Sequence, residues 1–159
     1  AGGGITEADT WRLNSTFTGV ASPMSSNLER DDSYGEGLLG TGMTVSSGIF
    51  SFPSTGFWQV DAHCSFFYDG DTQTTGIIIN TTPDDGSNWY AAAISWASAK
   101  QTEGYAGYNH TSCTKIIDVD DISNVKVRFI ASPSVTGVAF VGNSLTNHTY
   151  FVFKRLADT

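Results

Sequence analysis

Apolar and polar side chains alternate along residues 57–68, which follow a Pro-x-x-Gly segment at 53–56. One side of this extended chain carries an apolar set: Trp58, Val60, Ala62, Cys64, Phe66 and Tyr68. The opposite side carries a mixed set: Phe57, Gln59, Asp61, His63, Ser65 and Phe67. A period of two is the pattern of a β-strand with one face against a core. Pro53 lacks an amide donor and Gly56 tolerates positive φ, so this segment predicts the turn of a hairpin that serves as scaffold.

Similar runs of strand length recur along the rest of the chain. We expect strands near 10–19, 43–52, 57–68, 74–82, 89–98, 108–119, 124–131 and 148–155. Residues 20–42 are rich in glycine and acidic side chains, and they predict a long surface loop. This pattern predicts an all-β fold of two antiparallel sheets packed face to face, a jelly-roll or Greek-key sandwich. We expect residues 1–9 to be a linker or the end of an upstream stalk, and 10–159 to be a single head domain.

The composition favours β-strands and argues against nucleic acid as a partner. Val, Ile and Thr together number 39, against 6 Leu, and β-branched side chains favour the pleated surface of a sheet. The net charge of −8 argues against a nucleic-acid binder, because phosphate contacts require clustered basic side chains and the eight Lys and Arg are scattered. No apolar run is long enough to span a bilayer as a helix, so membrane insertion is not expected.

The residues that carry chemistry do not form a catalytic pattern. The three histidines, His63, His110 and His148, accompany no Gly-x-Ser-x-Gly motif, so we predict no enzyme activity. Asp69 and Asp71 offer oxygen ligands of the kind that Ca²⁺ takes but lack EF-hand spacing, and solvated turns are the preferred interpretation. The expectation is therefore a protein without a cofactor.

The chain has two cysteines, too few for a disulfide framework. Cys64 lies on the apolar side of its strand, which favours a buried free thiol. Cys113 falls in a later strand, and the sequence leaves open whether it pairs with Cys64.

The run at 149–154 has apolar side chains on both faces of a predicted strand. Tyr150 and Val152 point one way, and Phe151 and Phe153 point the other. One face of a strand in a two-sheet sandwich meets water, so a second apolar face needs a further cover. Without predicted helices to supply that cover, we expect another subunit. The expected subunit interface comprises Trp11, His63, Tyr150, Phe151 and Phe153.

Three segments resemble the C1q/TNF-like jelly-roll family. "TKIIDVDDISNVKVRF" is similar to its strand–turn–strand unit, with Asp120-Asp121 in place of the usual Gly-Asp. "NHTYFVFKRLAD" is similar to its aromatic closing strand, without the small residue and Gly that usually follow. "GIFSFPSTGFWQVDA" is similar to its Gly-x-Phe-x-x-Pro-x-x-Gly-aromatic segment, here Gly48, Phe50, Pro53, Gly56 and Phe57. The resemblance covers about residues 10–156, and it implies a homotrimer with both termini at one end and loops at the other.

The implied topology places the loops at 69–73, 99–107 and 132–147 together at the far end. Tyrosine offers a large, rigid and amphipathic contact, which suits recognition loops. Two alternatives stay open: Tyr108 begins a strand and packs inward, or recognition uses the grooves between subunits. Because some C1q-like heads hold calcium near the apex, the resemblance also makes Asp69 and Asp71 candidates for Ca²⁺. The expected receptor-binding residues are Asp69, Asp71, Tyr105, Tyr108, Phe140 and Asn143.

The sequence as a whole, including the segment "FKRLAD" near its end, is most similar to the head domains of bacteriophage and other viral fibres. The expected function is therefore that of a non-enzymatic trimeric head at the virion surface. It would sit on an upstream fibre shaft and bind a host cell-surface receptor or glycan. The alternative is a secreted, extracellular C1q/TNF-like recognition or signalling protein.

Overall fold

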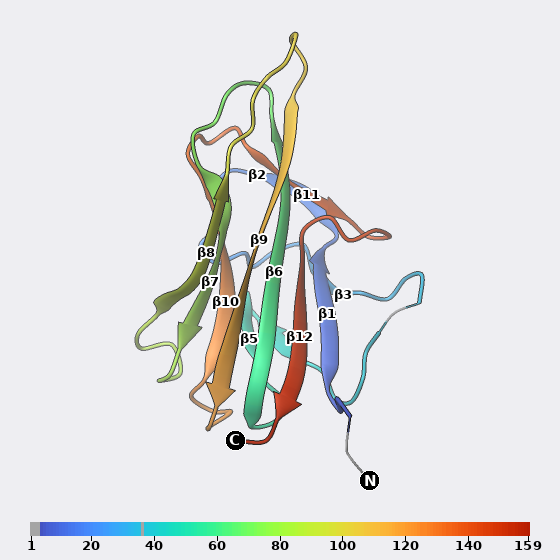
Figure 1. The fold of residues 1–159 in the computed structure, drawn as a ribbon, viewed down its shortest axis with the longest axis vertical. Coiled ribbons are helices and arrows are strands. Elements are labelled where there is room, and N and C mark those ends of the chain that lie inside the picture. The colour runs from blue at the N-terminus through green and yellow to red at the C-terminus, as the bar shows by residue number, and fades with distance from the viewer. Residues whose placement is uncertain (1–3, 36) are drawn as a thin grey trace.

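The β-branched and aromatic runs form strands that pack as two antiparallel sheets (Figure 1). The structure is a computed structural model that describes residues 4–35 and 37–159. None of these residues belongs to a helix long and apolar enough to cross a membrane. Within them lie twelve strands: β1 (Ala8–Leu13), β2 (Ser15–Thr18), β3 (Leu28–Arg30), β4 (Thr44–Ser46), β5 (Ile49–Ser51), β6 (Gly56–Tyr68), β7 (Thr75–Thr82), β8 (Tyr90–Ala97), β9 (Gly107–Val119), β10 (Lys126–Pro133), β11 (Ala139–Asn143) and β12 (Tyr150–Ala157).

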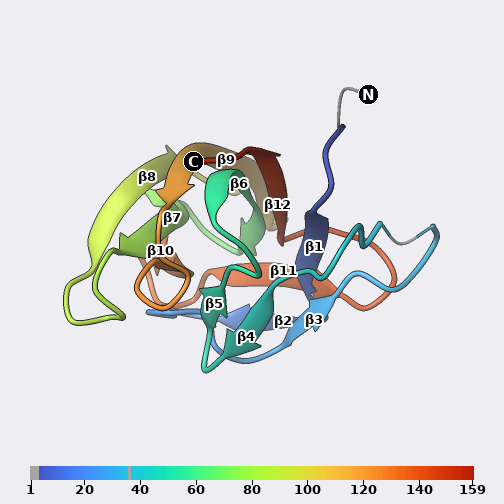
Figure 2. The same cartoon turned by 90° about the horizontal axis from the view of Figure 1, so that it is seen from below.

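The described residues form one sheet of seven strands and one of five. The seven-stranded sheet runs β2-β11-β6-β12-β1-β3, and β9 pairs with the other edge of β6 along its whole length. The five-stranded sheet runs β4-β5-β10-β7-β8. Seen from below, the two sheets form two facing layers (Figure 2). This arrangement confirms the predicted all-β jelly-roll sandwich.

The alternation predicted for residues 57–68 is confirmed in β6, but its turn has another role. The apolar set faces the five-stranded sheet, and all of it is buried except the half-buried Tyr68. However, β5 pairs in the five-stranded sheet, whereas β6 pairs in the seven-stranded one. The segment from Pro53 to Gly56 is therefore a corner between the two sheets, and the predicted hairpin is wrong. Trp58 Nε1 donates to the Ser54 carbonyl at 3.1 Å, which helps to hold this corner.

Several predicted boundaries need correction because short strands depend on distant partners. The expected strand at 10–19 is divided into β1 and β2, and the one at 43–52 into β4 and β5. The predicted loop at 20–42 contains β3, which pairs with β1. The predicted loop at 132–147 contains β11, which lies between β2 and β6.

A cluster of phenylalanines fills the space between the sheets. Phe151 and Phe153 of β12 are both 0% exposed. The ring of Phe151 stacks on Phe129 of β10 at 3.9 Å between centroids, and Phe153 lies 5.2 Å from Phe50 of β5. Burying each such side chain contributes roughly 1.5–3 kcal/mol to folding. The predicted subunit contact of Phe151 and Phe153 is therefore wrong, because the protomer's own core covers both rings.

Trp11 also lies on the inner side of its sheet. It pairs across β1 and β12 with Phe151, and its ring meets Phe50 edge-on at 5.5 Å between centroids. Its Nε1 donates to Asp9 at 2.9 Å, and the Arg30 guanidinium lies over the ring at 4.9 Å. The predicted place of Trp11 in a subunit interface is corrected to the rim of the core.

The two ends of the sandwich differ in what they carry. β1 begins and β12 ends at the lower end of the molecule, where the C-terminus lies (Figure 1). The β6–β7 and β8–β9 connections lie at the opposite end, and the β8–β9 connection forms the top of the molecule. We call these two ends the base and the apex.

Candidate functional site

Three connections form the apex: residues 69–74, 98–106 and 134–138, here called the apex loops. Thr72 links the first two, because its amide donates to the Ala99 carbonyl and its hydroxyl accepts from the Ala99 amide, both at 2.8 Å. The Ser134 amide donates to the Thr74 carbonyl at 2.7 Å and so joins the third. The structure therefore brings together the first two loops that the sequence predicted to share one end, but only residues 134–138 of the third, predicted at 132–147.

A two-residue turn forms the tip of the β8–β9 connection. Thr102 and Tyr105 exchange backbone hydrogen bonds, and both central residues have positive φ, 52° at Glu103 and 80° at Gly104. These are the features of a type I′ hairpin turn, which glycine accommodates readily. The turn projects Tyr105, which is 76% exposed.

The two apex carboxylates contact groups of the neighbouring loop. Asp71 accepts from the Gln101 amide at 3.0 Å, and Lys100 Nζ lies 3.6 Å from its other oxygen. Asp69 accepts from the side-chain amide of Gln101. Within the part of the chain that the structure describes, no group of three or more His, Cys, Asp or Glu is placed to hold a metal ion. The geometry therefore gives the two aspartates a role in joining loops.

Two predicted receptor-binding residues lie elsewhere. Phe140 is 0% exposed and stacks on Phe17 at 5.2 Å between centroids, so it is a core residue of β11 and β2. Asn143 is exposed, but its side-chain oxygen accepts from the amides of Leu145 and Thr146 at 2.7 and 3.0 Å. It caps a turn on the flank of the molecule. The prediction for Phe140 is wrong, and Asn143 does not join the apex loops.

The seven-stranded sheet has an outer face, the side turned away from the five-stranded sheet. At its centre the ring of His63 stacks on Tyr150 of β12 at 4.4 Å and on His110 of β9 at 5.9 Å between centroids. Nearer the apex, Phe67 stacks on Tyr108 at 4.9 Å. Tyr108 is 71% exposed, so it points outward and the alternative of inward packing is excluded.

Burial and neighbouring charges set the protonation of this face. Burial lowers the pKa of His63 below its ordinary value of 6.5, the neighbouring His110 lowers it further, and Asp61 partly offsets both. Asp61 is itself buried. It accepts from the Thr114 hydroxyl at 2.6 Å and from the Gln59 amide at 3.0 Å. The centre of the outer face therefore favours neutral imidazole.

Further apolar side chains extend this face over three strands. Phe57 and Ile116 are exposed, Ile116 by 55%, and Val152 is half-buried. Of the predicted interface residues, His63 and Tyr150 lie on this surface. The sequence alone did not identify the share contributed by β9, because apolar and polar residues do not alternate along 108–118.

A groove of about 450 Å³ lies on the outer face toward the apex. We call it the outer groove, and its lining residues are Ser65, Tyr108, Asn109, His110, Val141 and His148. Ser65 Oγ lies 3.3 Å from His110 Nδ1. Among residues 4–35 and 37–159, no carboxylate is hydrogen-bonded to His110, so the third member of a catalytic triad is missing there.

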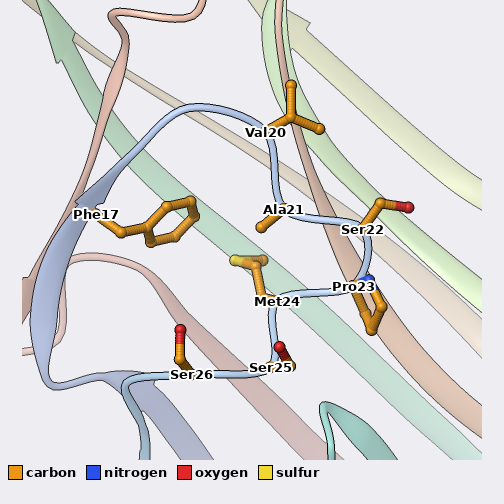
Figure 3. A pocket seen from close by; sticks show the side chains of 8 residues that line it. All are labelled: Phe17, Val20, Ala21, Ser22, Pro23, Met24, Ser25 and Ser26. Atoms are coloured by element: carbon orange, nitrogen blue, oxygen red, sulfur yellow. The ribbon is translucent and has the colours of Figure 1, made fainter.

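A second hollow, of about 330 Å³, lies against residues 20–26 (Figure 3). This segment continues the five-stranded sheet beside β10, because Ala21 pairs with Ala131 and the Met24 amide donates to the Phe129 carbonyl at 2.8 Å. Phe17, Met24, three smaller apolar side chains and three serines line the hollow. None of the residues that line this hollow is titratable, so the hollow has no group for acid–base chemistry.

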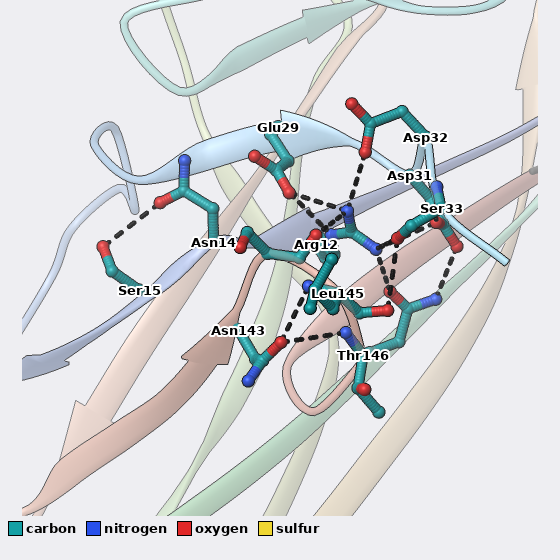
Figure 4. A network of polar contacts seen from close by, with 12 residues as sticks. Arg12, Asn14, Ser15, Glu29, Asp31, Asp32, Ser33, Asn143, Leu145 and Thr146 are labelled. Carbon is teal, nitrogen blue, oxygen red and sulfur yellow. Dashed lines mark hydrogen bonds and ion pairs between the residues drawn. The ribbon is translucent and has the colours of Figure 1, made fainter.

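A buried arginine organises the flank beside β1 (Figure 4). Arg12 is 1% exposed and donates to Glu29 at 2.8 Å and to Asp31 at 2.9 Å. Its guanidinium also contacts the Ser144 carbonyl of the β11–β12 connection. A guanidinium can satisfy several acceptors at once, so this Arg12 cluster ties three distant segments together. Sequence reasoning missed it, because the partners lie far apart along the chain.

The two cysteines are free thiols in the structure. Cys64 is buried, as predicted, and burial raises the pKa of its thiol. Cys113 is half-buried, and its pKa is raised for the same reason. The pairing that the sequence left open does not occur here, and neutral buried thiols are poor nucleophiles.

Sequence comparisons give no relative. No protein-family model matches the chain. No curated protein is similar to it in sequence.

Structural comparison gives close matches at low sequence identity. The Eiger TNF of S. frugiperda has a TM-score of 0.68 at 12% identity, covering 98% of this chain and 96% of that one. Murine APRIL at pH 5.0 has a TM-score of 0.64 at 13% identity, covering 94% and 98%. Murine APRIL at pH 8.5 has a TM-score of 0.60 at 12% identity, with the same coverage. The chain therefore has a TNF-like jelly-roll fold along almost its whole length.

Proposed function

We propose that this protein is a non-enzymatic recognition head that assembles as a homotrimer and binds a cell-surface receptor or glycan through its apex loops. The TNF-like fold supports the class of protein. The observation that carries the proposal is the outer face, where aromatic and aliphatic side chains of three strands lie open in a single protomer.

The outer face has the composition of a subunit contact. Phe57, Tyr108 and Ile116 are exposed, and the Tyr150–His63 stack lies between them with Asp61 fully hydrogen-bonded beneath. Interfaces favour aromatic side chains and place few charges at their centre. Exposed aromatic and aliphatic side chains gathered on one face are typical of an interaction site. A neighbouring subunit is the cover that we propose.

The apex loops supply the proposed receptor contact. Tyr105 projects from a turn whose glycine, Gly104, has no other heavy atom within 4 Å of where a Cβ would lie, so the tip stands clear of the body. A tyrosine on a tight turn binds with little loss of conformational freedom. Three copies at one apex would add avidity to weak single contacts.

We further propose that the head sits at the tip of a viral fibre, on the virion surface. The first strand begins at the base, so a shaft attached there would leave the apex free (Figure 1). Purified head should then compete with virus particles for adsorption to host cells. A head that instead binds a cellular receptor of its own organism and leaves adsorption unchanged would identify a secreted recognition protein.

The recognition role is tested by a triple apex variant, Tyr105→Ala with Asp69→Ala and Asp71→Ala. We expect the variant to keep its melting temperature and its trimer while attachment to cells or to a glycan array falls at least tenfold, a loss of about 1.4 kcal/mol. The matched control changes the same residue types at the base: Tyr90→Ala, Asp120→Ala and Asp158→Ala. Equal attachment by the two folded variants would move the site away from the apex.

A further inference from the structure

The three histidines of the chain all lie on the outer face or in its groove. His63 is at its centre on β6, and its ring is stacked with His110 of β9. His148 lies two residues before Tyr150, the residue that stacks on the other side of His63. His110 and His148 line the outer groove together. Imidazole is the side chain whose charge changes between pH 5 and 8, so the protein concentrates this response on one surface.

Few other charges face this cluster. On β6 the neighbour is Asp61, which is buried and already hydrogen-bonded by Thr114 and Gln59. On β9 the outward charge is Asp118, which pairs with Phe57 at the basal end.

On β12 the outward charge is Lys154, which pairs with Gln59, also toward the base. On β1 it is Arg12, which pairs with Tyr150 but is held by Glu29 and Asp31. The β11 strand adds no charged side chain. Of these carboxylates, Asp61 is the one that acts on the stacked His63, and it is already hydrogen-bonded.

We propose that the histidine cluster is a pH-sensitive element of the assembly, whose protonation below neutral pH weakens the contact between subunits. This inference rests on the proposed trimer and on its use of the outer face. Each subunit would place three imidazoles in a surface that the neighbouring subunit desolvates, and imidazole is the side chain that becomes positively charged in this pH range. Like charges brought together in such a surface, without enough carboxylates to pair with them, oppose association.

The lowered pKa of His63 agrees with this direction. Burial disfavours its charged form, and His110 adds to the effect. The neutral His63 ring contributes fully to the stability of the folded protein above its ordinary pKa of about 6.5. This contribution is lost as the pH falls through the lowered pKa of His63. A second subunit over the outer face would bury His63 further. This added burial would also lower the pKa of His63.

The test is light scattering after gel filtration from pH 7.5 down to pH 5.0, with three proteins compared. We expect the unmodified chain to be a trimer at pH 7.5 and to dissociate as pH falls, with a dissociation constant for the trimer raised about tenfold or more. The histidine-free variant, His63→Gln with His110→Gln and His148→Gln, should remain a trimer throughout. Lys154→Gln, a neutralised cation on the same face, should dissociate like the unmodified chain.

Each outcome decides the question. A trimer that persists at pH 5.0 overturns the inference and leaves the proposed function standing. Dissociation of the histidine-free variant at the same pH as the unmodified chain also overturns it and assigns the effect to carboxylates. A monomer at every pH overturns both proposals. If the histidine-free variant does not fold, His110→Gln alone must shift the midpoint of dissociation to lower pH, because His110 is exposed and tolerates replacement.

Discussion

Both faces of β12 carry apolar side chains, but the two faces differ in how far they are buried. The inner side chains Phe151 and Phe153 are completely buried against β5 and β10. The outer side chains Tyr150 and Val152 stay half-buried, with no layer from residues 4–35 or 37–159 over them. A strand that is apolar on both sides therefore indicates a partner, but only for the side that its own chain leaves open.

The chemistry of the two faces matches this difference. The buried part of the inner face consists of Phe151 and Phe153, which need no hydrogen-bond partner in a dry core. The outer face combines Tyr150 with His63 and with the satisfied carboxylate of Asp61. Side chains with an apolar body and a polar end tolerate exposure to water in the free protomer and burial in the assembled trimer. The outer face is therefore suited to two environments and the inner face to one.

Phe151→Asp should have the largest effect, because it breaks the inner face. The substitution leaves a cavity beside Phe129 and buries a carboxylate without a partner. We expect it to destabilise the protomer by about 5 kcal/mol or more, a large part of the total for most domains. Circular dichroism with thermal melting measures this loss. A folded Phe151→Asp monomer would show that the inner face is not the core.

Tyr150→Asp should have the next largest effect, and on assembly alone. The side chain points away from the core, so we expect the protomer to remain folded. A charge on the central stack of the outer face should weaken the trimer about a hundredfold, or about 2.7 kcal/mol. Light scattering at several protein concentrations measures the change. If Tyr150→Asp leaves the trimer intact, the subunits meet through another surface.

Gly56→Val should have a smaller effect that both faces share, because Gly56 begins β6 beside β12. Its φ is 137°, and an added Cβ would lie 2.5 Å from the Ala157 carbonyl oxygen. We expect a loss of roughly 2–3 kcal/mol from backbone strain and this clash.

Ser54→Val is the matched control within the same corner. The Ser54 hydroxyl is buried without a hydrogen-bond partner, so its replacement should be close to neutral. Thermal melts of the two variants test the difference. Equal melting temperatures would mean that the corner does not need glycine.

The elements that could be predicted are those whose signal is local. The alternation in β6 identified its buried side chains, and turn-rich segments separated most strands correctly. The corner at 53–56 resembles a hairpin in sequence, because the turn residues are the same whether the next strand joins the same sheet or the other one. Only the pairing of β5 with β10 settles this.

The site residues divide in the same way. The exposure of Tyr105 follows from the glycines that mark its turn, and the place of Asp69 and Asp71 at the apex follows from the long strand before them. Their part in receptor binding stays a prediction. Phe140 was assigned to a loop because β11 is short and its register comes from β2 and β6.

The Arg12 cluster lay beyond prediction for a related reason. Its hydrogen-bond partner Asn147 is 135 residues away along the chain. A contact between residues so far apart in sequence depends on the completed fold, and no local sequence pattern predicts it.

The position of β12 has a consequence for how the protein is made. β12 lies between β6 and β1 in the seven-stranded sheet, although it follows all the other described strands in the chain. During synthesis the sheet therefore has an open slot in its middle, with two unpaired edges and an uncovered aromatic layer, until β12 has left the ribosome. Long-range pairing of this kind is slow and exposes aggregation-prone edges. The nascent chain therefore needs protection until its closing strand arrives.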